Sequence, residues 1–266
     1  MNRRSLAVAL TAVVVAALGL GPAQGALAQP AKPTVVLVHG AWADASSWNK
    51  VIPRLLDDGY PVVAVANPLR SLPGDAAYIR AYLESVKGPV VLVGHSYGGA
   101  VITNAATGLK NIKALVYVNA FAPDTGESAT ALAGPDSALS ADPVTIFDFV
   151  PATLPPTPAT DLYLKRPTVF ASFATGLNAR DKALVAATQR PATLGALNEP
   201  SGAPAWKTIP SWYLIGAHDA IIPPAAERAM ALRAGSKIIE YGGGHLGLLS
   251  DSRTVAQGIE RAARAR

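Results

Sequence analysis

Residues 89–99 read PVVLVGHSYGG, and this stretch decides the fold. Its first half is a continuous apolar, β-branched run, which is typical of a strand buried on both faces of a parallel sheet. The sequence Gly94-His-Ser-Tyr-Gly98 follows at once and leads into a segment with helical spacing of apolar residues. A G-x-S-x-G pattern between a strand and a helix indicates a tight turn that exposes the serine above the end of the sheet. We therefore predict Ser96 as a nucleophile.

The segments on either side alternate between strands and helices. Continuous β-branched runs predict strands at residues 34–38, 61–66, 89–93, 114–118, 211–215 and 237–241. Amphipathic spacing predicts helices at residues 47–58, 75–86, 97–107, 224–234 and 250–265. Strands separated by such helices run parallel, with right-handed crossovers that place helices on both faces of the sheet. The sequence thus predicts an α/β fold with a mostly parallel, doubly wound sheet.

The alternation stops between residues 123 and 204, which contain 11 of the 22 prolines. Proline cannot donate to a strand ladder, and it breaks the hydrogen bonding inside a helix. We interpret this stretch as an insertion of short helices and loops rather than a separate domain, because the alternation resumes at Ser211. Insertions at the carboxyl ends of parallel strands lie where ligands bind. The stretch is therefore predicted to form a cap over the carboxyl ends of the strands.

Length and composition exclude several classes of protein. The chain has 266 residues, of which 50% are hydrophobic and 15% charged, and this suits one large domain with its own core. The absence of cysteine excludes a disulfide scaffold, thiolate metal sites and a cysteine nucleophile. The net charge is +5, but the basic residues are scattered and form no stripe or cluster. The charge therefore does not predict a nucleic-acid partner.

The first 28 residues have the three-part layout of a secretory signal. Arg3 and Arg4 form a basic start, residues 6–20 carry no charge, and Ala26-Leu-Ala28 offers small residues for signal peptidase. Cleavage after Ala28 leaves residues 29–266 as a single domain. A membrane anchor is the alternative, but the apolar run is shorter than the roughly 20 residues that span a bilayer. We predict a secreted or periplasmic protein without a stable membrane anchor, exported by the general or the twin-arginine route.

Serine needs a base to take its proton, and four histidines are available. His39 and His95 precede Ser96, whereas a nucleophile elbow expects the chain order serine, acid, histidine. His218 follows Ser96 but adjoins the best acid and would reverse that order. His245 remains, in a glycine-rich loop directly after the last predicted strand. We predict His245 as the base.

The acid has to hold the imidazole in the right tautomer and stabilise its charged form. Asp219 lies just past the predicted strand at 211–215, and the chain between it and His245 has room for one helix and one strand. This spacing brings both residues to neighbouring strand ends. Asp124, past the strand at 114–118, is the alternative, since a carboxylate there could point at the same imidazole. We predict Asp219.

An acyl-transfer intermediate also needs amide donors aimed at its oxyanion. One is expected from Tyr97, the residue after the nucleophile. The other is expected from the loop after the first predicted strand, and Gly40 in that loop places the amide of Ala41. Trp42, Phe121 and Phe147 are predicted to line the substrate pocket, with packing into the core as the alternative for an aromatic residue.

Four motifs together resemble the α/β-hydrolase superfamily. They are HGAW at 39–42, GHSYGG at 94–99, GAHD at 216–219 and GGH at 243–245, and the resemblance covers nearly all of residues 33–266. HGAW and YVNAFAPD at 117–124 are similar to the branch of plant methylesterases and hydroxynitrile lyases and its bacterial relatives. The lyases of that branch carry Thr after the first His and Lys after the catalytic His. This chain has Gly40 and Leu246 there, so the resemblance implies an esterase.

The sequence therefore predicts a serine hydrolase that cleaves carboxylic esters through an acyl-enzyme. No cofactor or metal is implied, because the triad and two amides supply the chemistry. No Arg or Lys pair near the motifs offers a clamp for an anion, so the predicted partner is a neutral, apolar ester of a small molecule. Two alternatives stay open: a non-catalytic ligand-binding α/β-hydrolase fold, and a carbon–carbon lyase or cofactor-free haloperoxidase that uses the same triad. The sequence does not determine the oligomeric state.

Overall fold

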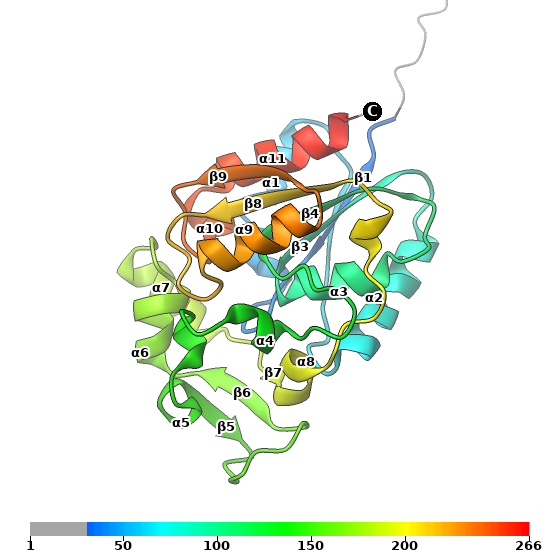
Figure 1. Ribbon diagram of the computed structural model, residues 1–266. Coiled ribbons are helices and arrows are strands. Elements are labelled where there is room, and N and C mark those ends of the chain that lie inside the picture. Colours follow the sequence, from blue (N-terminus) through cyan, green and yellow to red (C-terminus); the bar gives the residue numbers. More distant parts are fainter. Residues whose placement is uncertain (1–30, 266) are drawn as a thin grey trace, which may run out of the picture. The chain divides into compact units, whose positions relative to one another are not determined.

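A computed structural model describes residues 31–265, so the predicted signal sequence (1–28) lies outside the described residues. Its centre is a six-stranded sheet in which all neighbouring strands are parallel (Figure 1). The strands in spatial order are β2 (Val62–Val65), β1 (Thr34–Val38), β3 (Val90–Ser96), β4 (Ile112–Ala120), β8 (Ser211–Gly216) and β9 (Lys237–Tyr241). The predicted doubly wound α/β sheet is confirmed.

Helices cover both faces of this sheet (Figure 1). Helices α2 (Leu72–Ser85) and α3 (Tyr97–Ala105) contact each other on one face. Helices α1 (Ile52–Asp57) and α11 (Ser252–Arg264) contact each other on the opposite face. Helix α9 (Pro224–Arg233) packs on β8 and β9, and the short helix α10 (Gly247–Ser250) precedes α11. The middle strands are buried on both sides, which is why their sequences are continuous apolar runs.

Two predicted helices are interrupted in the structure. The segment predicted as one helix at 47–58 forms a 3-10 turn η1 (Ala45–Trp48) and then α1, because Pro53 lacks an amide hydrogen and suits only the first turn of a helix. The segment at 250–265 is broken at Asp251. The carboxylate of Asp251 accepts a hydrogen bond from the amide of Thr254 and caps α11.

The insertion at residues 123–204, called the cap below, lies between β4 and β8 at one end of the sheet (Figure 1). It contains short helices, as predicted, and also a three-stranded antiparallel sheet of order β5-β6-β7, which the proline content argued against. The prolines at 151–158 lie in the connection between β5 and β6, where no strand ladder requires a backbone N–H. Its elements are α4 (Ala129–Ala133), η2 (Ala138–Ser140), α5 (Pro143–Ile146), β5 (Phe147–Val150), β6 (Asp161–Leu164), α6 (Arg166–Thr168), η3 (Val169–Phe173), α7 (Ala179–Ala187), β7 (Ala192–Thr193) and α8 (Leu194–Asn198), and η4 (Ala205–Lys207) then leads back to the sheet.

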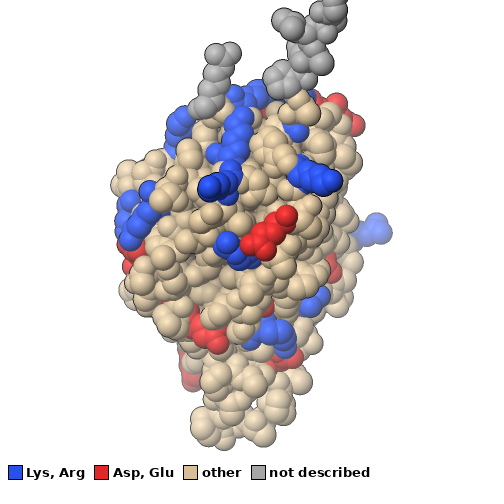
Figure 2. All heavy atoms as spheres, turned by 90° about the vertical axis from the view of Figure 1, so that its right-hand side faces the viewer, with Lys and Arg blue, Asp and Glu red and all other residues tan. Residues whose placement is uncertain are grey.

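The cap and the sheet domain also differ in surface charge. The lower end of the molecule in Figure 2, where β5 and β6 lie in Figure 1, carries few charged side chains on the visible face. Residues 149–160 contain none. Among residues 31–265, no helix is long and apolar enough to cross a membrane.

Candidate active site

Ser96 is the last residue of β3, and helix α3 begins at the next residue. Its backbone has φ 53° and ψ −127°, a conformation that residues other than glycine rarely adopt. The turn also requires close backbone approach, since a Cβ on Gly98 would lie 2.5 Å from the carbonyl oxygen of Val38. The strained turn places Ser96 Oγ above the sheet and at the amino end of α3.

His245 reaches this hydroxyl from the loop after β9. Its Nε2 lies 3.0 Å from Ser96 Oγ, and its Nδ1 lies 2.8 Å from Asp219 Oδ2. All three side chains are almost completely buried. The imidazole thus bridges a hydroxyl and a carboxylate in one hydrogen-bonded line, and the ring nitrogen that faces the serine can accept its proton.

Asp219 follows β8 and is held by more than the histidine. Its Oδ1 accepts hydrogen bonds from the amides of Ile221 (2.8 Å) and Ile222 (2.9 Å). Its Oδ2 accepts a third from the Asn119 amide at 3.2 Å, besides the contact with His245. These donors fix the orientation of the carboxyl group and the oxygen that faces the imidazole.

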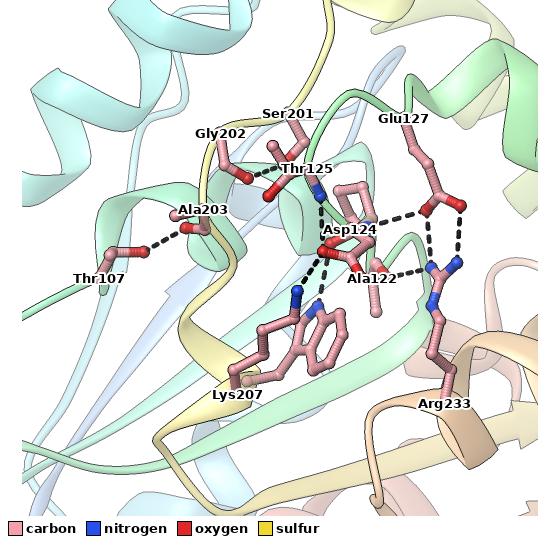
Figure 3. A network of polar contacts seen from close by, with 12 residues as sticks. Thr107, Ala122, Asp124, Thr125, Glu127, Ser201, Gly202, Ala203, Lys207 and Arg233 are labelled. Carbon is pink, nitrogen blue, oxygen red and sulfur yellow. Dashed lines mark hydrogen bonds and ion pairs between the residues drawn. The ribbon is translucent and has the colours of Figure 1, made fainter.

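The alternative acid lies elsewhere. Asp124 accepts a hydrogen bond from Lys207 Nζ at 2.6 Å, in a network of polar contacts at the base of the cap (Figure 3). In the same network both carboxylate oxygens of Glu127 accept from the guanidinium of Arg233, at 2.6 and 2.7 Å. The backbone of Ser201 accepts a hydrogen bond from the amide of Gly126 and donates one to the carbonyl of Glu127, which joins the beginning of the cap to its end. Asp219, not Asp124, faces the imidazole.

Two of the other histidines, His95 and His39, lie next to the site, but their side chains hydrogen-bond to residues other than Ser96. His95 Nε2 lies 2.9 Å from the carbonyl oxygen of His245, and burial lowers the pKa of His95 well below its usual value. His39 accepts a hydrogen bond from the amide of Asn67 and donates through Nδ1 to the carbonyl of Gly40 at 3.0 Å. Burial lowers the pKa of His39 to about 4, so both side chains are neutral near pH 7. The side chain of His218 is exposed.

The two predicted oxyanion donors lie beside Ser96. A Cβ on Gly40 would lie 2.6 Å from Ser96 Cβ, so glycine allows the loop after β1 to approach Ser96 closely. The amide of the next residue, Ala41, has no acceptor among the hydrogen bonds of the described residues. Tyr97 is the first residue of α3, and the first amides of a helix have no intrahelical partner. Its phenol is anchored by a 2.8 Å hydrogen bond to the buried carboxylate of Asp75.

A family model described as "Alpha/beta hydrolase family" matches residues 35–257. The chain belongs to the α/β-hydrolase family. It is 34% identical over 110 residues to a carbendazim hydrolyzing esterase of Nocardioides sp. (strain SG-4G), a match that covers 36% of this chain and 46% of the esterase. It is 36% identical over 104 residues to an alpha-hydroxynitrile lyase of Arabidopsis thaliana, covering 34% of this chain and 40% of the lyase. The chain thus aligns with less than half the length of each of these two relatives.

Solved structures share the fold of this α/β-hydrolase over most of its length. The methylesterase MES16 from Arabidopsis superimposes with a TM-score of 0.72, covering 86% of this chain and 98% of that chain, at 20% sequence identity. The predicted resemblance to the branch of methylesterases and hydroxynitrile lyases is confirmed.

In this α/β-hydrolase a cavity of about 460 Å³ lies between the end of the sheet and the cap. Ser96, Ala41 and Tyr97 line its floor. The three residues predicted for the substrate pocket, Trp42, Phe121 and Phe147, all line it. Most of the other lining residues come from the cap and are apolar, and no Lys, Arg, Asp or Glu is among the described residues that line it.

Three polar residues that sequence reasoning missed lie close to the site. Asn119 holds Asp219, Asp75 holds Tyr97, and Glu227 is a fully buried acid on α9. Burial raises the pKa of Glu227 well above its usual value, and the charge of Asp219 raises it further. For Asn119 a signal existed, because it is a polar residue at the end of an otherwise apolar strand. Asp75 and Glu227 follow the polar spacing of a helix and carried no such signal.

Proposed function

We propose that the protein hydrolyses carboxylic esters of neutral, apolar small molecules through an acyl-enzyme on Ser96. One observation carries the proposal: His245 bridges Asp219 and the Oγ of Ser96, which lines an apolar cavity. A serine in this arrangement is activated as a nucleophile, and a buried carboxylate orients the base. The relative in Nocardioides, which is named an esterase, supports the same reaction class.

The reaction begins when His245 Nε2 takes the proton of Ser96 as Oγ attacks the ester carbonyl. The amides of Ala41 and Tyr97 donate to the oxyanion of the tetrahedral intermediate. His245 then gives the proton to the departing alkoxide, which leaves as the alcohol while the acyl group stays on Ser96. Water attacks the acyl-enzyme with His245 as the base, and collapse of the second intermediate releases the carboxylic acid. Asp219 stabilises the imidazolium in both halves of the cycle.

The lining of the cavity supports the substrate class. A charged acyl or alcohol group would lose its hydration there without meeting a side chain of opposite charge. Apolar surface that enters such a cavity gains about 25 cal/mol per Å² removed from water. A neutral ester with an apolar chain is therefore the substrate that the cavity favours.

Labelling with a fluorophosphonate and turnover of a short-chain p-nitrophenyl ester test the proposal together. Mass spectrometry is expected to locate the adduct on Ser96, and Ser96→Ala is expected to abolish both labelling and turnover. Ser140 is an internal control, because it lines the same cavity but donates to the carbonyl of Pro135 and has no histidine partner among the described residues. Folded protein that stays unlabelled at Ser96 contradicts the acyl-enzyme mechanism and favours a ligand-binding role.

Cyanohydrin cleavage is the second candidate, because of the similarity to the Arabidopsis lyase. Leu246 follows His245 where the lyases of the branch carry lysine, and no lysine lines the cavity among the described residues. A departing cyanide would meet no cation there. Product analysis with a cyanohydrin distinguishes the two reactions, and a bromination assay with peracid tests the haloperoxidase alternative.

We also propose that the protein is exported, on the evidence of the sequence pattern in residues 1–28. Expression of the full chain in a bacterial host, followed by amino-terminal sequencing of the protein outside the cytoplasm, tests this. The expected mature protein begins at Gln29. Uncleaved protein that stays with the membrane fraction favours the anchor.

A further inference from the structure

A second cavity adjoins the active site and takes no part in the mechanism above. It has a volume of about 240 Å³ and lies between the segment that follows Trp42 and the cap helix α7. Its apolar wall includes Phe173, Val185 and Leu246, and the ion pair of Lys50 with Asp181 (3.3 Å) contributes to its polar side. Neither Ser96 nor the oxyanion residues line it.

Trp42 is shared by this cavity and the one that contains Ser96. Among the described residues, Trp42 alone lines both cavities. It directly follows Ala41, one of the proposed oxyanion donors, and lines the same cavity as Ser96. The side chain is only 3% exposed. The indole contacts Phe147, which lines the catalytic cavity, and Phe173, which lines the second one, so it lies at their boundary.

The indole of Trp42 is held in place by contacts with three residues. The indole Nε1–H donates to the carbonyl of Leu162 in β6 at 2.9 Å. The ring stacks on Phe147 with centroids 5.6 Å apart and meets Phe173 edge-on at 5.8 Å. Phe173 in turn lies 5.2 Å from the ring of His245. The backbone of Trp42 has φ 57°, an uncommon conformation for a bulky residue that the surrounding contacts maintain.

From this arrangement we infer that Trp42 is the specificity-determining residue that sets the length limit of the ester, by closing the catalytic cavity against the second one. The inference rests on the proposed ester hydrolysis. A chain short enough for the first cavity stays on the catalytic side of the indole. A longer chain meets the ring, because the hydrogen bond to Leu162 and the two aromatic contacts keep the ring from turning aside.

Removing the indole joins the two cavities and admits a longer chain. The chain then enters a space whose wall is largely aliphatic and aromatic. Each methylene that leaves water for such a space contributes about a fourfold gain in kcat/KM. The gain concerns only long esters, since short ones never reach the second cavity.

The experiment compares kcat/KM for wild type, Trp42→Ala and Trp42→Leu over two series of esters. One series lengthens the acyl chain of p-nitrophenyl esters from acetate to laurate, and the other lengthens the alcohol of an acetate ester. We expect the longest accepted chain to increase in at least one series, with about a fourfold gain for each additional methylene accepted. Trp42→Leu keeps an apolar side chain at the position, which provides a measurement if Trp42→Ala does not fold.

A filled second cavity provides the matched control. Val185→Trp places a large side chain in that cavity, away from Ser96. In wild type it is expected to leave the length profile unchanged, and in the Trp42→Ala protein it is expected to restore the wild-type limit. A folded Trp42 variant with an unchanged profile in both series overturns the inference, and so does a double variant that keeps the longer limit. Absence of ester turnover in wild type is a different result and contradicts the proposed function instead.

Discussion

The carboxyl end of the sheet and the cap face the same cavity but are built on different principles. At the sheet, Ser96, His245 and Asp219 form a hydrogen-bonded line, and further donors hold the carboxylate. The cap contributes mostly apolar side chains, which set the shape of the cavity by packing and not by hydrogen bonds. Loss of one residue from the hydrogen-bonded line removes its function, whereas replacement of one apolar residue in the cavity wall changes the shape of the cavity only slightly. In the proposed reaction the chemistry therefore depends on the residues at the end of the sheet, whereas selectivity depends on the apolar wall of the cavity, most of which comes from the cap.

The largest expected difference concerns two aspartates, one in the sheet site and one at the base of the cap. Asp219→Asn is expected to lower kcat about 10⁴-fold, because the amide favours the wrong tautomer of His245. Asp124→Asn removes only a contact with the half-exposed Lys207 and is expected to leave kcat within about twofold of wild type. Steady-state kinetics on one short ester measures both. Loss of activity in Asp124→Asn would show that the base of the cap is coupled to the chemistry.

Substrate charge tests the apolar wall of the cap. The half-ester mono-p-nitrophenyl glutarate is expected to have a kcat/KM about 100-fold below that of p-nitrophenyl pentanoate, because its carboxylate would be desolvated without a partner. The two esters share a leaving group and nearly the same length, so the comparison isolates the charge. Preference for the glutarate would contradict the apolar-cavity interpretation and direct attention to the basic residues of the cap.

Glu227 provides a test of buried charge on the sheet side. Burial raises its pKa, so the folded protein keeps a proton that the unfolded chain releases above the ordinary carboxyl value of 4.5. Glu227 therefore contributes most to stability below that pH, and this contribution is lost as the pH rises toward the folded pKa, by at most about 1.4 kcal/mol per pH unit. Glu227→Gln removes this dependence.

We expect Glu227→Gln and wild type to unfold at similar denaturant concentrations at pH 4, and the variant to be the more stable protein at pH 8. Glutamine keeps the shape of the side chain and its capacity to hydrogen-bond with Gly216 and Asn119, the polar neighbours of Glu227. Equal pH dependence in both proteins would mean that Glu227 is ionised in the folded state.

The smallest expected effect is at the ion pair that joins the cap to α9. Glu127→Gln weakens the paired hydrogen bonds with Arg233 and is expected to lower the free energy of unfolding by about 1 kcal/mol, since both side chains are about one-third exposed. The effect should decrease at high salt. Lys50→Ala, at the half-exposed ion pair with Asp181, is the matched control with a smaller effect. A large loss of kcat in Glu127→Gln would contradict the separation of the two regions.

Local patterns predicted the sheet well and the cap only in outline. Each buried strand is a continuous apolar run, so all six strands of the main sheet were predicted within a few residues. In the cap, residues 147–164 contain both strand sequences and a proline cluster. The proline cluster argued against strands in this region. Only the pairing of β5 with β6 shows that the prolines lie in the connection between the two strands.

By itself the sequence determined the parallel sheet and the candidate nucleophile, base and acid. The patterns that predict strands and the serine turn consist of residues that are neighbours in the sequence. Only the tertiary structure decided which aspartate faces His245, that Asn119 donates to this aspartate, and that Trp42 lines two cavities. Each of these depends on contacts between distant segments: Asn119 and Asp219 are 100 residues apart, and Trp42 and Leu162 are 120 apart. Periodicity carries no information about such contacts, because they arise when packing brings the ends of different strands and the cap to one place.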